Sequence, residues 1–431
     1  MNGTTTLEED STPTPSTQTA SAPVMVLLHL LRRPWLRIES ISRADLLIGI
    51  GFLGLLGRVA LAVRSIGSND IMTWAVFGYS IRTKGLGHVY DTIPLFNHPP
   101  LMGWMAALAN QISTGLHLRF DILFKLPAIA ADGVGGLLVY RTWRSQKGPA
   151  YAALVFCLFC WNPVSMFVSA YHGNTDCLCA MLILLSALLV DRGRAFLGGL
   201  ALAGSINVKL IGLLMIPVLL SSVRTWRDVQ RLLAGLALGV IPFLPFILFH
   251  WATFSSHVIG YRPMPNYWGI TLFLTGLQQT ARWASVGPWL ASDYTKLGVR
   301  LILAAPVVLG LFNWNWTTRQ RRWSARQMAA IVYALFLVLT PGFGIQYTVY
   351  PVLVLFAASP ARAAAYALAG GAYVVLVYFS LWTGTFPAFS DFNAAYPIAP
   401  QGLGYIAWAS LAHAAIQLSF HRPRARVRIG V

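Results

Sequence analysis

The chain has 431 residues, of which 56% are hydrophobic and 11% charged, and its formal net charge is +18. This composition excludes a soluble domain, because several apolar runs are long enough to cross about 30 Å of hydrocarbon as helices. The sequence lacks ten-residue units of alternating apolar and polar residues, which excludes a transmembrane β-barrel. We predict an all-α, polytopic helical membrane protein, since helices satisfy their own backbone polar groups in the bilayer.

The positive charge does not indicate nucleic-acid binding. Only five of the basic residues are Lys, and the basic residues cluster in short loops between apolar runs. The positive-inside rule predicts that such loops face the cytoplasm, so the expected partners include membrane lipids and no nucleic acid. The loops are residues 141–147, 191–194, 224–231, 317–326 and 421–428.

The N-terminal region is predicted to lie outside the membrane domain. Residues 1–23 are rich in Thr, Ser and Pro, so we expect a disordered tail and no signal peptide. Residues 24–42 are basic and amphipathic, which predicts a helix on the cytoplasmic surface. Residues 43–431 are then expected to form a single transmembrane domain.

The first span is predicted over residues 44–63 and leads into an outer loop over residues 64–98. Apolar residues recur at helical spacing within this loop, which predicts a helix lying along the outer membrane surface. These residues are Ile71, Trp74, Phe77, Gly78 and Ile81.

Residues 195–223 lie between two basic loops, which predicts two short helices, up and back, with a bend within residues 205–210. We expect 11–13 crossing or half-crossing helices in the whole chain. Further spans are predicted over residues 232–250, 297–312 and 363–382, and outer segments over residues 257–269, 340–351 and 383–402.

One conflict in the predicted topology stays open. If residues 99–115 and 118–140 both cross fully, the basic loop 141–147 lies outside and residues 171–176 lie inside. Either one of these segments does not cross fully, or the charge rule fails once.

The four cysteines are predicted to pack within the membrane domain. Cys157, Cys160, Cys177 and Cys179 lie in or beside apolar helices and have no His or Cys partners at zinc-site spacing.

Asp70 stands where the chain leaves the first span, in a sequence with only 14 acidic residues. Two interpretations are open: Asn69 or Asp70 caps the following helix, or Asp70 is a general base at the outer mouth of a membrane cavity. His98 precedes two prolines at the interface, where capping, hydrogen bonding and catalysis are all open interpretations.

A second polar group lies between two apolar stretches and contains His172, Asn174 and Asp176, the last of which could also cap the next helix. Lys209 stands in apolar surroundings far from the basic loops, which predicts a partner anion, either a carboxylate or a bound phosphate. The outer segments add further candidates. An interfacial belt of aromatic residues would explain tyrosines there, but it does not explain Arg262 or Gln346. These candidates are Tyr261, Arg262, Gln346 and Tyr347.

Together these features resemble the GT-C superfamily of integral membrane glycosyltransferases that use polyprenyl-phosphate sugars. The nearest resemblance is to the catalytic subunit of glycosylphosphatidylinositol mannosyltransferase I, followed by the asparagine-linked glycan glucosyltransferases. The resemblance covers roughly residues 45–350, although the first outer loop has a single Asn-Asp pair and no DxD-type pair. It rests on Asp70 and on the motifs HPPLMGW (98–104), WNPVSMFVSAYHGNTD (161–176), NVKLIGLLMIP (207–217) and PGFGIQYTVYP (341–351).

The resemblance implies an inverting transferase that moves a hexose, with mannose favoured, from a polyprenyl-phosphate donor to a lipid or glycan hydroxyl. It implies that Asp70 is the general base and that Lys209 and Arg262 bind the donor phosphate. It also implies a site on the non-cytoplasmic face of a bacterial plasma membrane or an endoplasmic reticulum, with neither cofactor nor metal. The implied substrate-binding residues are Asn69, His98, His172, Asn174, Asp176, Tyr261, Gln346 and Tyr347.

Two alternatives come from other functional classes. A membrane transporter would also contain charges within the membrane, but internal repeats and helices broken at matching positions would be expected, and neither is evident. The second alternative is a non-catalytic lipid-binding protein of GT-C-like fold.

Overall fold

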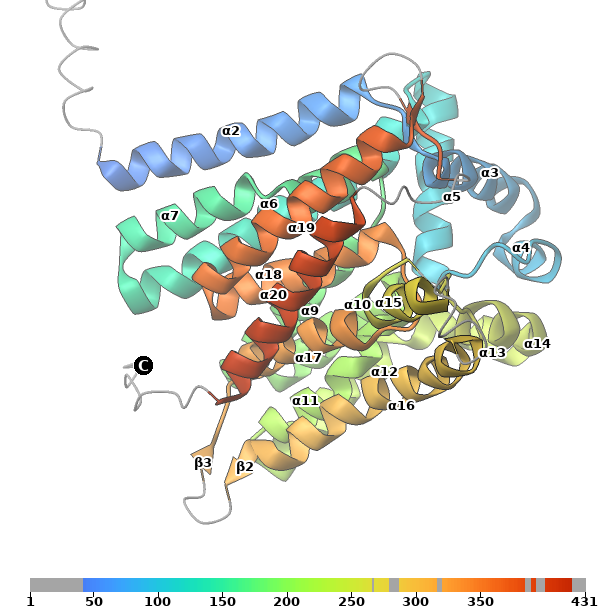
Figure 1. The fold of residues 1–431 in the computed structure, drawn as a ribbon. Coiled ribbons are helices and arrows are strands. Elements are labelled where there is room, and N and C mark those ends of the chain that lie inside the picture. Colours follow the sequence, from blue (N-terminus) through green and yellow to red (C-terminus); the bar gives the residue numbers. More distant parts are fainter. Residues whose placement is uncertain are drawn as a thin grey trace, which may run out of the picture.

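The structure is a computed structural model that describes residues 42–265, 267–278, 287–315, 320–383, 389–392 and 400–420. The tail and the cytoplasmic helix predicted before residue 42 lie outside the described residues. The described chain is a bundle of helices with a few two-residue strands (Figure 1). This architecture confirms the prediction of an all-α, polytopic fold.

The described elements fall into two halves of similar helical content. The first half contains α2 (Arg43–Arg64), β1 (Gly67–Ser68), α3 (Asn69–Lys84), α4 (Leu86–Thr92), α5 (Pro100–Leu116), α6 (Phe120–Lys147), α7 (Pro149–Cys160), α8 (Pro163–Met166), η1 (Phe167–His172), α9 (Asp176–Asp191), α10 (Ala195–Val208), η2 (Leu210–Leu214) and α11 (Met215–Ser222). The second half contains α12 (Trp226–Gly239), η3 (Ile241–Phe243), α13 (Leu244–Phe249), α14 (Trp251–Phe254), η4 (Ser255–Ile259), α15 (Gly269–Gln278), α16 (Gly287–Asn313), β2 (Trp314–Asn315), β3 (Gln320–Arg321), α17 (Ala325–Leu339), η5 (Ile345–Val349), α18 (Tyr350–Ala358), α19 (Pro360–Ser380), β4 (Trp382–Thr383), β5 (Phe389–Ser390) and α20 (Gln401–Phe420).

Five described helices are long and apolar enough to cross a membrane: Arg43–Arg64, Phe120–Lys147, Trp226–Phe249, Ser292–Asn313 and Pro360–Ser380. A sixth candidate is the helix pair Pro149–Cys160 and Pro163–His172, which is bent by 45°. Four shorter apolar helices also occur within the described residues. The predicted spans therefore coincide with apolar helices, whereas the expected total of 11–13 crossing segments stays a prediction.

The sequence of α2 explains why a span forms there. The Ser42 hydroxyl caps its start by accepting the backbone N–H of Asp45 at 3.2 Å. Asp45 in the first turn and Arg64 in the last turn complement the helix dipole. One face packs on α6 and α7, while Phe52 and Leu56 on another face are exposed, as expected for a surface that faces lipid.

Residues 195–223 bend at the predicted place. α10 ends at Val208, η2 begins at Leu210, and Lys209 between them has an extended backbone with φ −158° and ψ 138°. The return leg continues through η2 and α11, so the side chain of Lys209 lies at a turn between two apolar helices.

The position of α5 bears on the conflict in the predicted topology. α5 has 17 residues and is shorter than the described helices that are long and apolar enough to cross a membrane. In Figure 1 it runs across the direction of α2 and α6, at the end of the bundle where α3 and α4 lie. The predicted basic loop 141–147 is instead the last part of α6, which runs from this end of the bundle to the other.

Four of the basic segments gather at the end where α2 begins. Loop 141–147 lies there in Figure 1, as do β2 and β3. Asp191 accepts hydrogen bonds from the backbone N–H groups of Ala325 and Arg326, which places loop 191–194 beside the start of α17. Ser221 lies beside Gly310 near the end of α16, which places loop 224–231 at the same end. The segment 421–428 lies outside the described residues.

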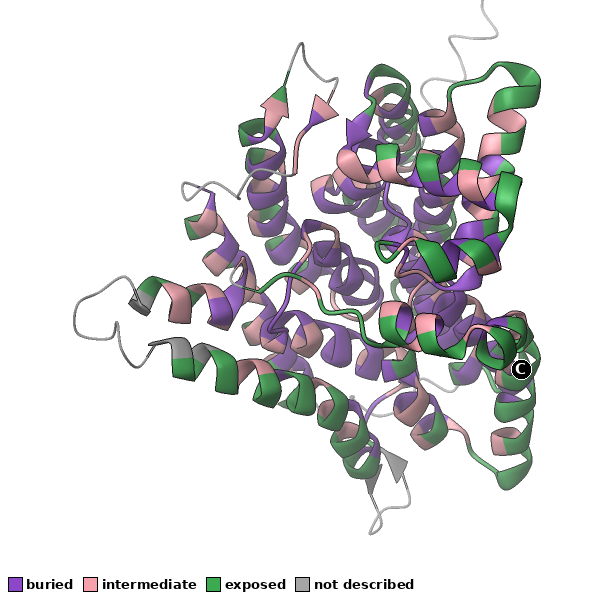
Figure 2. Cartoon of the chain, turned by 90° about the vertical axis from the view of Figure 1, so that its right-hand side faces the viewer, coloured by how far each residue is buried: buried purple, intermediate pink, exposed green. Residues whose placement is uncertain are grey.

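The core lies along the centre of the bundle. Figure 2 views the molecule from the end with α3 to α5, and buried residues fill the centre while exposed faces lie at the periphery. In α18 every residue from Tyr350 to Ala357 is buried. Cys160, Cys177 and Cys179 are buried and all four cysteines are free, which confirms the prediction that they pack within the domain.

One ion pair is buried inside this core. Arg58 Nε lies 2.9 Å from Asp132 Oδ2, and the two side chains are 0% and 4% exposed. Arg58 also donates to the Ser165 hydroxyl at 2.8 Å, and the Ser169 hydroxyl donates to Asp132 at 2.7 Å. Because a buried charge is costly without a partner, this cluster fixes α2 and α6 against the bent helix that carries Ser165 and Ser169.

Candidate active site

The candidate site begins at the first turn of α3. Asp70 lies in this turn, and its side chain is 42% exposed. Its carboxylate accepts hydrogen bonds from two side chains of another segment. His172 Nε2 lies 2.8 Å and Asn174 Nδ2 lies 3.1 Å from Asp70 Oδ2. The residue at the N-cap, Ser68, makes no side-chain capping bond. The hydrogen bonds of the Asp70 side chain are thus with the 172–174 turn and not with the backbone of its own helix.

His172 and Asn174 are positioned by a break in a membrane helix. Asn162 caps α8 by accepting the N–H groups of Val164 and Ser165, and Pro163 fits the first helical position. η1 then continues as a π-helical turn, a geometry that is frequent at functional sites, and ends at His172. This break turns the polar end of the helix toward α3.

Gly173 allows the turn to lie against α3. Its φ is +75°, a conformation that favours glycine, and a Cβ atom here would overlap the side chain of Ile71 on α3. The close approach of the two backbones is what brings His172 within hydrogen-bond distance of Asp70.

A tyrosine that the sequence reasoning missed completes the surroundings of His172. Tyr378 Oη lies 2.6 Å from His172 Nδ1, and the Tyr378 side chain is buried. The ring of Phe392 lies against both His172 and Tyr378, with centroid distances of 5.4 Å and 5.2 Å. Tyr378 stands in an apolar run where no local pattern distinguishes it from a packed core tyrosine.

Asn69 joins the site to a segment near the end of the chain. Its Nδ2 donates to Asp391 Oδ1 at 2.7 Å, and its Oδ1 accepts the backbone N–H of Phe392 at 2.8 Å. β5 pairs in parallel with β1, so Ser390 lies beside Ser68. Asn69 therefore anchors the segment 389–392 beside Asp70.

Lys209 has a carboxylate partner. Its Nζ lies 2.9 Å from Asp176 Oδ1, and the side chains are 20% and 0% exposed. Tyr350 Oη also donates to Asp176, and the backbone N–H of Asp176 donates to Asn174 Oδ1 at 3.3 Å. Lys209 lies over the ring of Tyr347 at 4.8 Å from the centroid. Asp176 is thus fully engaged and buried, whereas the Lys209 side chain keeps 20% of its surface exposed.

His98 interacts electrostatically with both Asp70 and Lys209. Its ring is 4.4 Å from that of Trp74, centroid to centroid. Burial and the charge of Lys209 lower the pKa of His98, the charge of Asp70 opposes them, and the net effect lowers this pKa from 6.5 to about 3. His98 is therefore neutral near pH 7 and can both donate and accept a hydrogen bond.

Asp70 is ionised at any physiological pH. Burial raises the pKa of Asp70, but the positive charges that His172 and His98 carry when protonated and the hydrogen bonds from His172 and Asn174 outweigh this effect. The net effect lowers the pKa of Asp70 from 3.8 to about 2. Its oxygens accept hydrogen bonds and can receive a proton.

Among the described residues, no hydrogen bond or ion pair joins Asp70 to the remaining predicted residues. Tyr261 is exposed and interacts electrostatically with Lys209. Arg262 is exposed, and no ion pair is assigned to it among the described residues. Gln346 lies half-buried in η5 beside Gly344, next to the Tyr347 that packs on Lys209.

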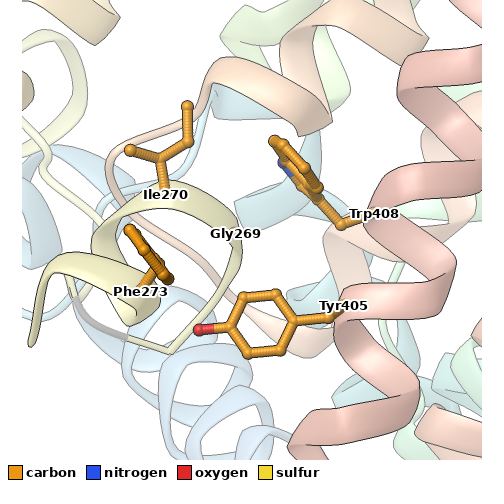
Figure 3. Close-up of a pocket in the computed structure, with 5 residues that line it drawn as sticks. All are labelled: Gly269, Ile270, Phe273, Tyr405 and Trp408. Atoms are coloured by element: carbon orange, nitrogen blue, oxygen red, sulfur yellow. The ribbon is translucent and has the colours of Figure 1, made fainter. Parts of the chain in front are cut away.

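An apolar groove of about 280 Å³ lies between α15 and α20 (Figure 3). Aromatic contacts lead from its edge toward Lys209: Trp268 stacks on Phe343 at 4.8 Å, and Phe343 contacts Tyr347 at 6.4 Å. The groove is lined by Gly269, Ile270, Phe273, Tyr405 and Trp408.

Comparison with known proteins assigns this membrane fold to the class of GT-C-type membrane glycosyltransferases. The chain belongs to glycosyltransferase family 87, whose family model matches residues 96–341. It is also 28% identical over 151 residues to GPI alpha-1,6-mannosyltransferase 2 of Mus musculus. That match covers 32% of this chain and 28% of the relative's length. The predicted resemblance to GT-C-type membrane glycosyltransferases is therefore confirmed at the level of the family.

Proposed function

We propose that the protein is an inverting glycosyltransferase that moves a hexose, with mannose favoured, from a polyprenyl-phosphate donor to a hydroxyl of a lipid or glycan acceptor. The observation that carries the proposal is the half-exposed carboxylate of Asp70, held by His172 and Asn174. The similarity to the mouse mannosyltransferase favours mannose. No observation favours a transporter or a non-catalytic lipid-binding protein.

In the proposed reaction the acceptor oxygen attacks the anomeric carbon of the donor from the face opposite the phosphate. The new C–O bond forms as the bond from the anomeric carbon to the phosphate oxygen breaks, so the configuration inverts. The acceptor proton passes to Asp70, and the polyprenyl phosphate leaves with the bonding electron pair. His172 and Asn174 orient the Asp70 carboxylate through their hydrogen bonds.

The leaving phosphate gains negative charge, so a cation near it lowers the barrier. Lys209 is 20% exposed and is proposed to contact the phosphate through its accessible part. Because Asp176 compensates part of its charge, we propose that the exposed Arg262 supplies the second positive charge. We propose that Asn69, His98, Tyr261, Gln346 and Tyr347 line the sugar and acceptor sites, whereas Asp176 acts through Lys209. The reaction as proposed includes neither metal nor cofactor.

The donor's isoprenoid tail needs an apolar surface that leads away from the phosphate. The groove in Figure 3 is apolar, and the aromatic contacts described above connect its edge with Lys209. We propose that the tail lies in this groove. The site would then face the non-cytoplasmic side, because the basic loops lie at the opposite end of the bundle.

The experiment is transfer by the purified full-length protein in nanodiscs. Radiolabelled polyprenyl-phosphate-mannose, the corresponding glucose donor and a nucleotide-sugar donor are each supplied with a membrane-lipid acceptor pool. We expect label in a new lipid or glycan from polyprenyl-phosphate-mannose. Transfer from the nucleotide sugar alone would contradict the proposed donor, and transfer only from the glucose donor would correct the sugar.

A further inference from the structure

The ring of His172 makes two hydrogen bonds, and their chemistry fixes which nitrogen carries the proton. Asp70 is ionised, so its oxygens accept, and Nε2 of His172 must carry the hydrogen of the 2.8 Å bond. A neutral imidazole has one N–H, so Nδ1 has a lone pair and accepts the hydrogen of the Tyr378 hydroxyl over 2.6 Å. For a neutral ring, the direction of each bond follows from the other.

We infer that Tyr378 is a positioning residue for Asp70: its hydroxyl donates to Nδ1 and thereby holds His172 in the tautomer that donates to the carboxylate. This inference rests on the proposed role of Asp70 in glycosyl transfer. Tyr378 is buried and reaches Asp70 through His172.

Tyr378 is itself held from several sides. Its ring lies 5.7 Å from Phe167 and 5.2 Å from Tyr171, centroid to centroid. The Ser390 hydroxyl donates to the backbone carbonyl of Tyr378 at 2.9 Å. α19 and the segment 389–392, which both lie outside the matched residues 96–341, thus fix the hydroxyl against His172.

Removal of the hydroxyl leaves Nδ1 without its hydrogen-bond partner, so the imidazole ring is held only by its bond to Asp70. The ring can then turn, and the Nε2–H bond to the Asp70 carboxylate loses its fixed geometry. The carboxylate would lose its orientation, so kcat should fall, whereas substrate affinity should change little because the buried Tyr378 is distant from solvent.

The test compares steady-state transfer by wild type, Tyr378→Phe and Tyr366→Phe in nanodiscs. Tyr366 is a matched control on the same helix, since it is equally buried and its hydroxyl donates one hydrogen bond, to the Thr348 carbonyl at 2.7 Å. We expect Tyr378→Phe to lower kcat about tenfold with KM within about twofold. Tyr366→Phe should leave both within about twofold. Equal losses in the two variants would overturn the inference.

A double-mutant comparison separates positioning from a general structural effect. In a His172→Gln background, Tyr378→Phe should lower kcat by less than about twofold, because its effect acts through the missing imidazole. A tenfold loss that persists in this background would overturn the inference.

A spectroscopic readout does not depend on the donor. The ¹⁵N spectrum of histidine-labelled protein, compared with that of His172→Gln, assigns the His172 ring. We expect one protonated and one unprotonated nitrogen near pH 7, and a shift of the unprotonated signal in Tyr378→Phe alone. Two protonated nitrogens, or no shift, would overturn the inference. Absence of transfer from every donor by wild type would contradict the proposed function and leave this spectrum to decide the role of Tyr378.

Discussion

The low pKa of Asp70 bears on how a proton would be transferred. A carboxylate with a pKa of about 2 is a weak base. Such a base is adequate if the sugar carbon has already developed positive charge, as in the oxocarbenium-like transition states of glycosidic bond cleavage. The acceptor hydroxyl then becomes acidic as it bonds to that carbon. The account therefore predicts late proton transfer to Asp70.

His98 should make stability depend on pH. Its pKa is about 3 in the folded protein and 6.5 ordinarily, so below pH 6.5 the unfolded chain binds the proton more readily. The contribution of neutral His98 to the free energy of unfolding is therefore fully present above pH 6.5, and it decreases as the pH falls from 6.5 toward 3. The slope is at most about 1.4 kcal/mol per pH unit.

Thermal unfolding in detergent between pH 7.5 and pH 5 measures this dependence. We expect a smaller decrease in melting temperature for His98→Gln than for wild type. Parallel curves for the two proteins would contradict the assignment of a buried, neutral His98.

At the scale of the element, the turn after η1 depends on the lack of a side chain at Gly173. Gly173→Ala should lower transfer at least about tenfold, because a Cβ overlaps Ile71 and moves His172 away from Asp70. The control is Gly193→Ala: its φ is +76° and nothing lies within 4 Å of the added Cβ. Equal transfer rates for the two variants would contradict the role assigned to the contact between residue 173 and Ile71.

The bend between α10 and η2 should depend on the ion pair of Lys209. Lys209→Met leaves the fully buried Asp176 without its cation and should cost about 3 kcal/mol of stability. The control is Lys296→Met, which removes an exposed pair with Asp293 at 3.7 Å and should cost less than about 1 kcal/mol. Unfolding by a denaturing detergent compares the two, and similar losses would contradict the assigned importance of the buried pair.

Local periodicity predicted the helices well, but it did not predict which residues from distant helices contact each other. The five residues predicted to form the apolar face of the helix after the first span are the buried residues of α3. The bend at Lys209 was predicted equally well from the spacing of basic loops. The contact of Tyr378 with His172 was not predicted, because the two residues are 206 positions apart and the apolar run around Tyr378 gives no reason for a polar partner.

At the scale of the whole molecule, the arrangement of basic loops predicts an orientation. Lys147 lies at the end of the bundle where the basic segments gather. Leu95 lies beside α4 at the other end, and its side chain is 74% exposed. The variants Lys147→Cys and Leu95→Cys therefore place a thiol at each end. In sealed vesicles with the cytoplasmic face inside, an impermeant maleimide should label Leu95→Cys and not Lys147→Cys. The reverse pattern would contradict a non-cytoplasmic site.

Hydropathy alone could not settle this topology, because it does not reveal the direction of a helix. The apolar sequence of α5 suggests a span, whereas in the structure the helix runs across the direction of α2 and α6. The same limit applies to the site: Asn69 and Asp391 are 322 residues apart and meet only because β1 and β5 pair. Residue types at the site were predictable, whereas the contacts of Asp176 with Lys209 and of Asn69 with Asp391 needed the fold.

The most direct measurement of the central claim is single-turnover transfer from polyprenyl-phosphate-mannose by Asp70→Asn and Asp91→Asn. The two carboxylates are matched, since Asp70 is 42% and Asp91 45% exposed and each hydrogen-bonds a histidine, His172 and His250 respectively. The account predicts that Asp70→Asn lowers the transfer rate at least about 100-fold and that Asp91→Asn stays within about threefold of wild type. Transfer by Asp70→Asn at the rate of Asp91→Asn would contradict the assignment of Asp70 as the base.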